Sequence, residues 1–167
     1  MAQATQIVSH WNTMIEGLQV SPKEFFSAVE QEIQRRQTPE TKFSRIDWRE
    51  GGLMSAKREY LRVRRKDLAF DVCGAPFGSG FFVSWWLGEV PSGLLALLAS
   101  IPGLGMLVYW YLRVFKTETY YKYDTASMFQ SLVHASVLSV IDEFTTAKGL
   151  RALSDTERTP QVRNFFG

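Results

Sequence analysis

The chain has 167 residues, a net charge of +2 and an aromatic content of 14%. This length suits one domain with a sizeable core, and the small net charge does not favour a nucleic-acid partner. The single cysteine, Cys73, excludes an intramolecular disulfide and a cysteine-rich zinc site, and it is compatible with a reducing compartment. The opening residues MAQATQIVSHWN lack a basic start and a continuous apolar run, so we expect no secretory signal there.

Residues 1–40 are predicted to form a pair of short helices. In the stretch ATQIVSHWNTMIEGLQ the apolar residues recur at helical spacing. The next stretch, SPKE, has a capping residue at Ser21, a proline at the first helical position and Glu24 three residues after the cap. These residues indicate the start of a second helix, which ends before Thr38 and Pro39.

Residues 42–87 are predicted to form a small antiparallel meander. The segments FSRIDWR, EYLRVRR, LAFDVCG and FFVSWWL are short, rich in β-branched and aromatic residues, and nearly alternate in polarity. Their connections at Gly51-Gly52, at Lys66-Asp67 and over residues 75–80 are too short for crossover helices, which favours antiparallel pairing.

Residues 88–112 are predicted to form an apolar helical hairpin. From Val90 to Leu112 the chain has 23 residues without a formal charge, and about 20 helical residues suffice to cross a bilayer core. Pro102 and Gly103 break a straight helix near its middle and would leave backbone groups unsatisfied in lipid. The longer arm is only about 22 Å long as a helix, so a re-entrant hairpin in one leaflet is favoured over a single span. The residues expected to insert are Leu94, Leu95, Leu97, Leu98, Ile101, Leu104, Met106, Leu107 and Val108.

Aromatic and basic residues flank this segment. Tryptophan and tyrosine favour the headgroup region of a bilayer, where the ring is apolar and its N–H or O–H stays hydrated. The residues expected at this interface are Trp85, Trp86, Tyr109, Trp110 and Tyr111. Basic side chains attract anionic lipid headgroups, and the candidates are Arg62, Arg64, Arg113 and Lys116. A solvated strand face is the alternative for the basic stretch KREYLRVRRK, residues 57–66.

The sequence is compatible with two other environments for the apolar segment. It could be buried in a contact between subunits, or it could be an ordinary core element of its own chain. Left uncovered on a monomer, a patch of this size would be an aggregation hazard, so we expect some surface to cover it.

The C-terminal part is predicted to contain an amphipathic helix over residues 124–149 and a polar tail over residues 150–167. The helix has a broad apolar stripe, and Gly149 is a natural stop. The tail ends in Phe165 and Phe166, which would form a short docking peptide for a protein partner or pack against their own domain.

No pattern indicates an enzyme. The two histidines, His10 and His134, fall in predicted helices, and nothing in the sequence brings either of them to Cys73 as a nucleophile pair. Ligands at metal-binding spacing are not evident, so neither a metal nor a cofactor is predicted. The loop GAPFGSG lacks the Gly-Lys-Ser/Thr ending of a phosphate loop.

Together these patterns predict a single α+β domain over residues 1–167, with an N-terminal helical pair, a small antiparallel β-meander, an inserted apolar helical hairpin and a C-terminal amphipathic helix. The predicted function is a non-enzymatic, membrane-associated interaction or assembly subunit, and a membrane-perturbing effector is a related version. We expect it at the cytoplasmic face of a membrane, with anionic lipid headgroups and a protein partner or a homo-oligomer as its partners. The alternative is a soluble structural subunit of an oligomer that uses the hairpin as its subunit contact.

Overall fold

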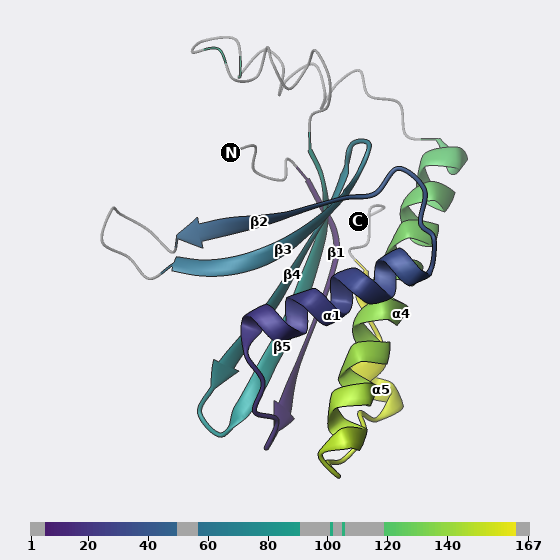
Figure 1. Ribbon diagram of the computed structural model, residues 1–167. Coiled ribbons are helices and arrows are strands. Elements are labelled where there is room, and N and C mark those ends of the chain that lie inside the picture. Colours follow the sequence, from purple (N-terminus) through teal and green to yellow (C-terminus); the bar gives the residue numbers. More distant parts are fainter. Residues whose placement is uncertain (1–5, 50–56, 91–100, 102–104, 106–118, 163–167) are drawn as a thin grey trace.

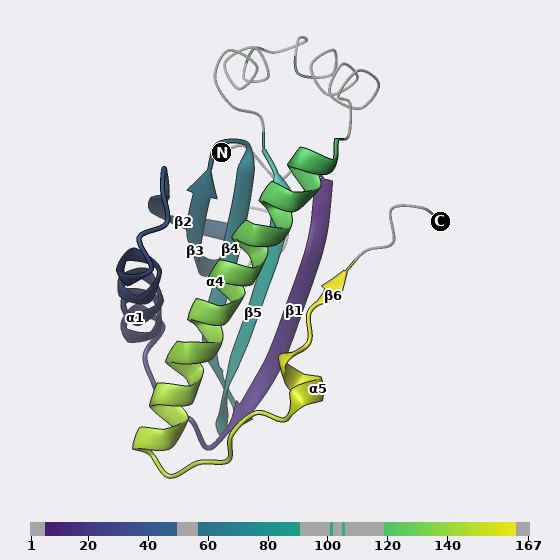
Figure 2. The same ribbon diagram turned by 90° about the vertical axis from the view of Figure 1, so that its right-hand side faces the viewer.

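A six-stranded antiparallel sheet carries two helices on one of its faces (Figure 1). The computed structural model describes residues 6–49, 57–90, 101, 105 and 119–162. In chain order the elements are β1 (Gln6–Glu16), α1 (Pro22–Arg35), β2 (Lys42–Arg49), β3 (Lys57–Arg65), β4 (Leu68–Phe77), β5 (Gly80–Glu89), α4 (Tyr120–Ala147), α5 (Asp155–Arg158) and β6 (Gln161–Val162). The strands lie in the order β2-β3-β4-β5-β1-β6. Figure 2 shows α4 lying across the sheet, with α1 beside it on the same face.

The predicted fold class is wrong at the N-terminus, where the first helix of the expected pair is the strand β1. This strand pairs with β5 from Gln6↔Glu89 to Glu16↔Gly80, and its odd-numbered residues from Ser9 to Ile15 are buried. Trp11 and Ile15 are four residues apart, a spacing that places two side chains on one face of a helix and equally on one face of a strand. The long pairing with β5, which a local pattern does not reveal, decides for the strand.

One helix, α1, follows where a pair was predicted. The hydroxyl of Ser21 accepts a hydrogen bond from the backbone N–H of Glu24 at 3.1 Å, and Pro22 occupies the first turn. The face of α1 that is turned to the protein buries Phe25, Phe26, Val29 and Ile33.

The strands β2 to β5 lie in the four segments that were predicted as strands, and consecutive strands are antiparallel neighbours. The turn between β3 and β4 is Lys66-Asp67, and Lys66 adopts a positive φ of 53°. Gly78, with a φ of 58°, provides the same left-handed conformation between β4 and β5. The sheet is larger than the predicted meander, because β1 and β6 extend it beyond β5.

The long helix α4 covers the centre of the sheet. It begins at Tyr120, four residues earlier than predicted, because Thr119 caps it by accepting a hydrogen bond from the N–H of Lys122. The inward stripe of α4 buries Phe129, Val133, Val137 and Ile141. Phe129 packs edge-on against Phe70 of β4, with 6.0 Å between the ring centroids.

The chain after α4 returns to the sheet edge. Ser154 and Glu157 form a capping box that starts α5, and the two residues of β6 then pair with Ser9 and His10 of β1. The indole Nε1 of Trp11 donates a hydrogen bond to the backbone oxygen of Glu157 at 2.6 Å. The first half of the predicted tail is therefore part of the fold, whereas Phe165 and Phe166 lie outside the described residues.

The predicted apolar hairpin lies almost entirely outside the described residues. Its first two positions, Gly88 and Glu89, belong to β5 instead, since the strand continues to Glu89. Ile101 is described and is exposed. Within the described part of the chain, no helix is both long enough and apolar enough to cross a membrane.

Candidate functional site

Val90 and Thr119, the described residues on either side of residues 91–118, lie at the same end of the domain. Val90 follows β5 directly, and its N–H donates a hydrogen bond to the backbone oxygen of Asp67 in the β3–β4 turn at 2.7 Å. Figures 1 and 2 show that α4, which starts after Thr119, begins at this end as well. We call this end of the molecule the insertion end.

The insertion end has basic and aromatic residues. The β3–β4 turn contributes Arg64, Arg65 and Lys66, of which Lys66 forms an ion pair with Glu40 at 3.6 Å. On the other side of the exit point, Tyr120 and Tyr121 begin α4 with 91% and 76% of their surfaces exposed. Tyrosine rings and basic side chains are residue types that favour lipid headgroups.

The two tryptophans predicted at a membrane interface lie on opposite faces of the sheet, because neighbouring strand residues point in opposite directions. Trp85 is fully buried beneath α4, where its Nε1 donates a hydrogen bond to Nδ1 of His134 at 3.0 Å. Trp86 is 40% exposed on the other face, where its indole stacks on the ring of His10 with 4.7 Å between centroids. Only Trp86 is accessible to a partner or to lipid.

Arg62 and Arg64 share a face of β3, but only Arg64 lies near the surface. Arg62 is buried and donates two hydrogen bonds to the carboxylate of Asp71, at 2.6 and 2.7 Å. Its guanidinium also lies over the ring of Trp48, 5.9 Å from the centroid. Arg64 is half-buried, and its Nε donates to the backbone oxygen of Lys66 at 3.1 Å. A binding role for Arg62 would require it to exchange Asp71 for a new partner.

Most of the other predicted site residues lie outside the described residues. These are the inserting residues Leu94, Leu95, Leu97, Leu98, Leu104, Met106, Leu107 and Val108, the aromatics Tyr109, Trp110 and Tyr111, the basic residues Arg113 and Lys116, and the docking pair Phe165 and Phe166.

The described part of the chain assembles no cysteine–histidine pair. Cys73 is buried on the face opposite α4, with Tyr60, Ser84 and Arg58 as its hydrogen-bond partners. Burial raises the pKa of the Cys73 thiol, and the charge of Arg58 opposes this effect. Because the effect of burial is larger, the thiol stays protonated. His134 instead bonds Trp85 on the other side of the sheet. Among the described residues, no group of histidine, cysteine and carboxylate side chains is arranged to hold a metal ion.

The arrangement that sequence reasoning missed is the row of side chains across the face opposite α4. Register places Arg62 beside Asp71, Asp71 beside Trp86 and Trp86 beside His10. The alternation within EYLRVRR and FFVSWWL predicts which residues of each strand share a face, but the relative position of the strands comes only from their pairing.

No protein-family model matches the chain, and no curated protein or solved structure matches it either.

Proposed function

We propose that the protein is a non-enzymatic, membrane-associated interaction subunit, held on one face of a bilayer by the uncharged segment that begins at Val90. The observation that carries this proposal is that residues 91–118 start and finish at the insertion end of one packed domain.

Packing holds the two flanks of this segment together. β5 and α4 are joined by the hydrogen bond between Trp85 and His134, and β4 meets α4 where Phe70 packs against Phe129. Val90 and Thr119 must therefore lie on the same side of any membrane that the intervening segment enters. A single span would separate them, so the packing favours a segment that goes in and returns.

Length supports a shallow insertion. The 28 residues between Val90 and Thr119 divide into two arms of about 14 residues, or roughly 21 Å each as helices. A bilayer core is about 30 Å thick, so neither arm would cross it. Pro102 and Gly103 stand near the midpoint, where a hairpin would turn.

The residues at the insertion end agree with contact to a cytoplasmic leaflet. That leaflet carries a negative surface potential, and each basic residue close to it contributes about 1 kcal/mol of attraction. Arg64, Arg65 and Lys66 supply basic groups, of which Lys66 is paired with Glu40, and Tyr120 and Tyr121 supply amphipathic rings.

Flotation with liposomes tests the proposal. The full chain should float with vesicles that contain an anionic lipid, and a Leu97→Asp/Leu98→Asp variant should stay at the bottom of the gradient, since a charge in the bilayer core costs about 3 kcal/mol. Met128→Asp is the matched control, because Met128 is exposed on α4 and lies outside the segment. Failure of the wild-type chain to float, together with a defined oligomer in detergent-free buffer, would contradict the proposal and favour a soluble structural subunit.

A further inference from the structure

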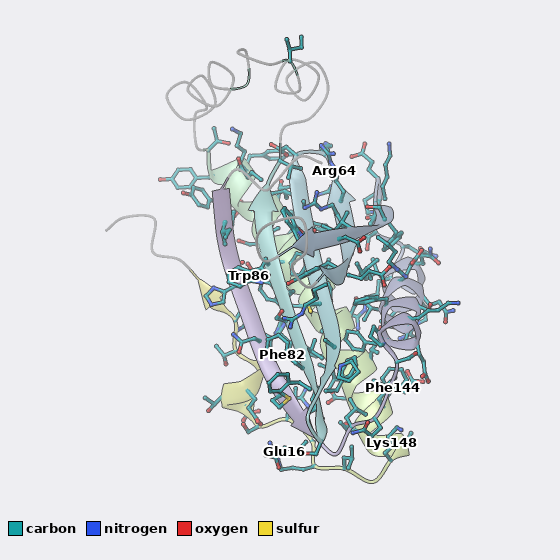
Figure 3. The ribbon with its side chains drawn as sticks, turned by 90° about the vertical axis from the view of Figure 1, so that its left-hand side faces the viewer. Glu16, Arg64, Phe82, Trp86, Phe144 and Lys148 are labelled. Carbon is teal, nitrogen blue, oxygen red and sulfur yellow. The ribbon has the colours of Figure 1, made fainter. Side chains whose placement is uncertain are left out.

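One face of the sheet carries no helix of the described residues. The helices α1 and α4 lie on the other face, and Figure 3 looks directly onto the uncovered one, where Arg64, Phe82 and Trp86 are labelled. We call it the open face. Large sheets usually bury both faces or place polar residues on the solvated one, so the composition of the open face indicates what it meets.

Apolar side chains gather on the β1–β5 side of the open face. A bulge between Ile7 and Ser9 turns Ile7 onto this face opposite Gly88, beside Trp86. Towards the other end of the same strands, Met14 pairs with Phe82, and Phe77 follows at the β4–β5 hairpin. Ile7, Met14, Phe77 and Trp86 are four of the large hydrophobic residues that the structure leaves exposed.

Basic side chains occupy the β2–β3 side of the same face. Register and alternation place Arg58 and Arg64 of β3 there, with Lys42 of β2 opposite Arg64, whereas Arg62 between the two arginines is buried and held by Asp71. The open face is thus divided lengthwise into an apolar half and a basic half.

We infer that the open face is the docking surface for an amphipathic helix of a partner protein, one whose apolar stripe is flanked by acidic residues. This inference rests on the proposed interaction function and names the class of its partner. The apolar stripe would lie along β1 and β5, and the acidic flank would face Arg58 and Arg64 of β3. Charge complementarity selects this occupant over a helix with a basic flank.

The geometry of the face sets the spacing of the helix anchors. Trp86 and Phe82 are four residues apart on β5, or about 13 Å at the rise of a strand. Asn12 and Ser84 form a polar step between these two apolar groups. A helix rises about 1.5 Å per residue, so two hydrophobic anchors about nine residues apart would reach both groups.

Peptide titration tests the inference on the full chain, both in lipid nanodiscs and in detergent-free buffer. The probes are two synthetic helices of about 18 residues with the same leucine stripe, one flanked by glutamates and the other by lysines. The glutamate peptide should change the fluorescence of Trp86 on binding and should bind at least about tenfold more tightly than the lysine peptide. A Trp86→Phe variant identifies the part of the signal that comes from this residue.

Paired variants separate the open face from the rest of the surface. Met14→Glu should lower the affinity for the glutamate peptide by about tenfold or more, because the substitution places a charge in the apolar half of the open face. Met128→Glu is the matched control on the exposed side of α4 and should leave binding unchanged. Arg58→Glu should reverse the preference between the two peptides, whereas Lys23→Glu on α1 should not.

Equal binding of both peptides, or binding that is indifferent to Met14→Glu in a variant that melts like the wild type, would overturn the inference. Loss of flotation in Met14→Glu without any peptide binding would also overturn it, since the open face would then meet lipid. Flotation of the wild-type chain reports on membrane association separately, so failure of the docking surface and failure of the proposed function give different results.

Discussion

His134 connects three parts of the fold that are far apart in sequence. Its Nδ1 accepts the hydrogen bond from Trp85 of β5, so Nε2 carries the ring proton and donates to the backbone oxygen of Arg158 at 2.7 Å. Arg158 in turn binds the carboxylate of Asp142 on α4, at 2.6 and 3.0 Å. The neutral imidazole therefore links the sheet, the long helix and the C-terminal segment.

Acid should weaken this connection. Burial lowers the pKa of His134 below its ordinary value of 6.5, and the charge of Arg158 acts in the same direction, against the backbone hydrogen bond to Arg158. Since the unfolded chain takes up a proton more readily than the folded one, the stabilising contribution is complete above about pH 6.5 and is lost as the pH falls towards the folded pKa. We expect the free energy of unfolding, measured by urea titration, to fall between pH 7 and pH 5.

A His134→Gln variant provides the control. Its side-chain oxygen would accept from Trp85 and its amide would donate to Arg158, without a titrating group. This variant should lose less stability than the wild type over the same pH interval. Equal losses in both proteins would assign the pH dependence to other residues.

At single positions the sequence predicts the kind of side chain on each strand face better than it predicts whether that side chain is buried and what it contacts. The basic residues of segment 57–66 and the apolar residues of segment 81–87 can be recognised in the printed sequence, and so can the alternation within each strand. That Arg62 is buried against Asp71 depends on β4 lying beside β3, and that Trp85 is buried depends on α4 crossing β5. Both facts are long-range, so a residue's own neighbours in sequence do not contain them.

At the scale of elements, the contact of α1 with the sheet depends on a residue without a side chain. A Cβ atom added to Gly74 of β4 would lie 2.5 Å from Cδ1 of Phe25, well inside van der Waals contact. Both residues are fully buried, so neither has free space to move into.

We therefore expect Gly74→Ala to destabilise the protein by about 1 to 3 kcal/mol, the usual cost of an overpacked core. Thermal unfolding followed by circular dichroism measures the loss. Phe25→Leu in the same chain should recover part of it by making room, and a double-mutant cycle gives the coupling between the two sites. Additive effects would show that the two side chains do not compete for this space.

The elements that the sequence reveals best are those with a local signal. Ser21, Pro22 and Glu24 mark the start of α1, and short alternating segments mark β2 to β5. β1 was predicted as a helix because IVSHWNTMI satisfies both periodicities, and its partner strand is distant in the chain. The sequence predicts the start of α4 four residues too late, because the cap Thr119 precedes two tyrosines that give no helical pattern of their own.

For the whole molecule, the proposed anchoring makes a prediction about sidedness. Lys66 and Tyr120 are both exposed at the insertion end. Lys66 lies in the turn to which Val90 is hydrogen-bonded, and Tyr120 begins the helix that follows residues 91–118. Single cysteines at these positions, Lys66→Cys or Tyr120→Cys in a Cys73→Ala background, should react with an impermeant maleimide from the same side of sealed vesicles. Reaction from opposite sides would show a span between them and would contradict the re-entrant arrangement.

The position of β1 between β5 and β6 also bears on how the protein is made. Among the described strands β1 is synthesised first and is an inner strand of the finished sheet, and its longest partner, β5, is complete only when residue 89 has been synthesised. The next residues to emerge are the uncharged ones that begin at Pro91, while the helix that covers the sheet is still to come. Closure of the sheet and synthesis of the uncharged segment therefore fall in the same interval of translation, when an unpaired strand and an apolar stretch are exposed together.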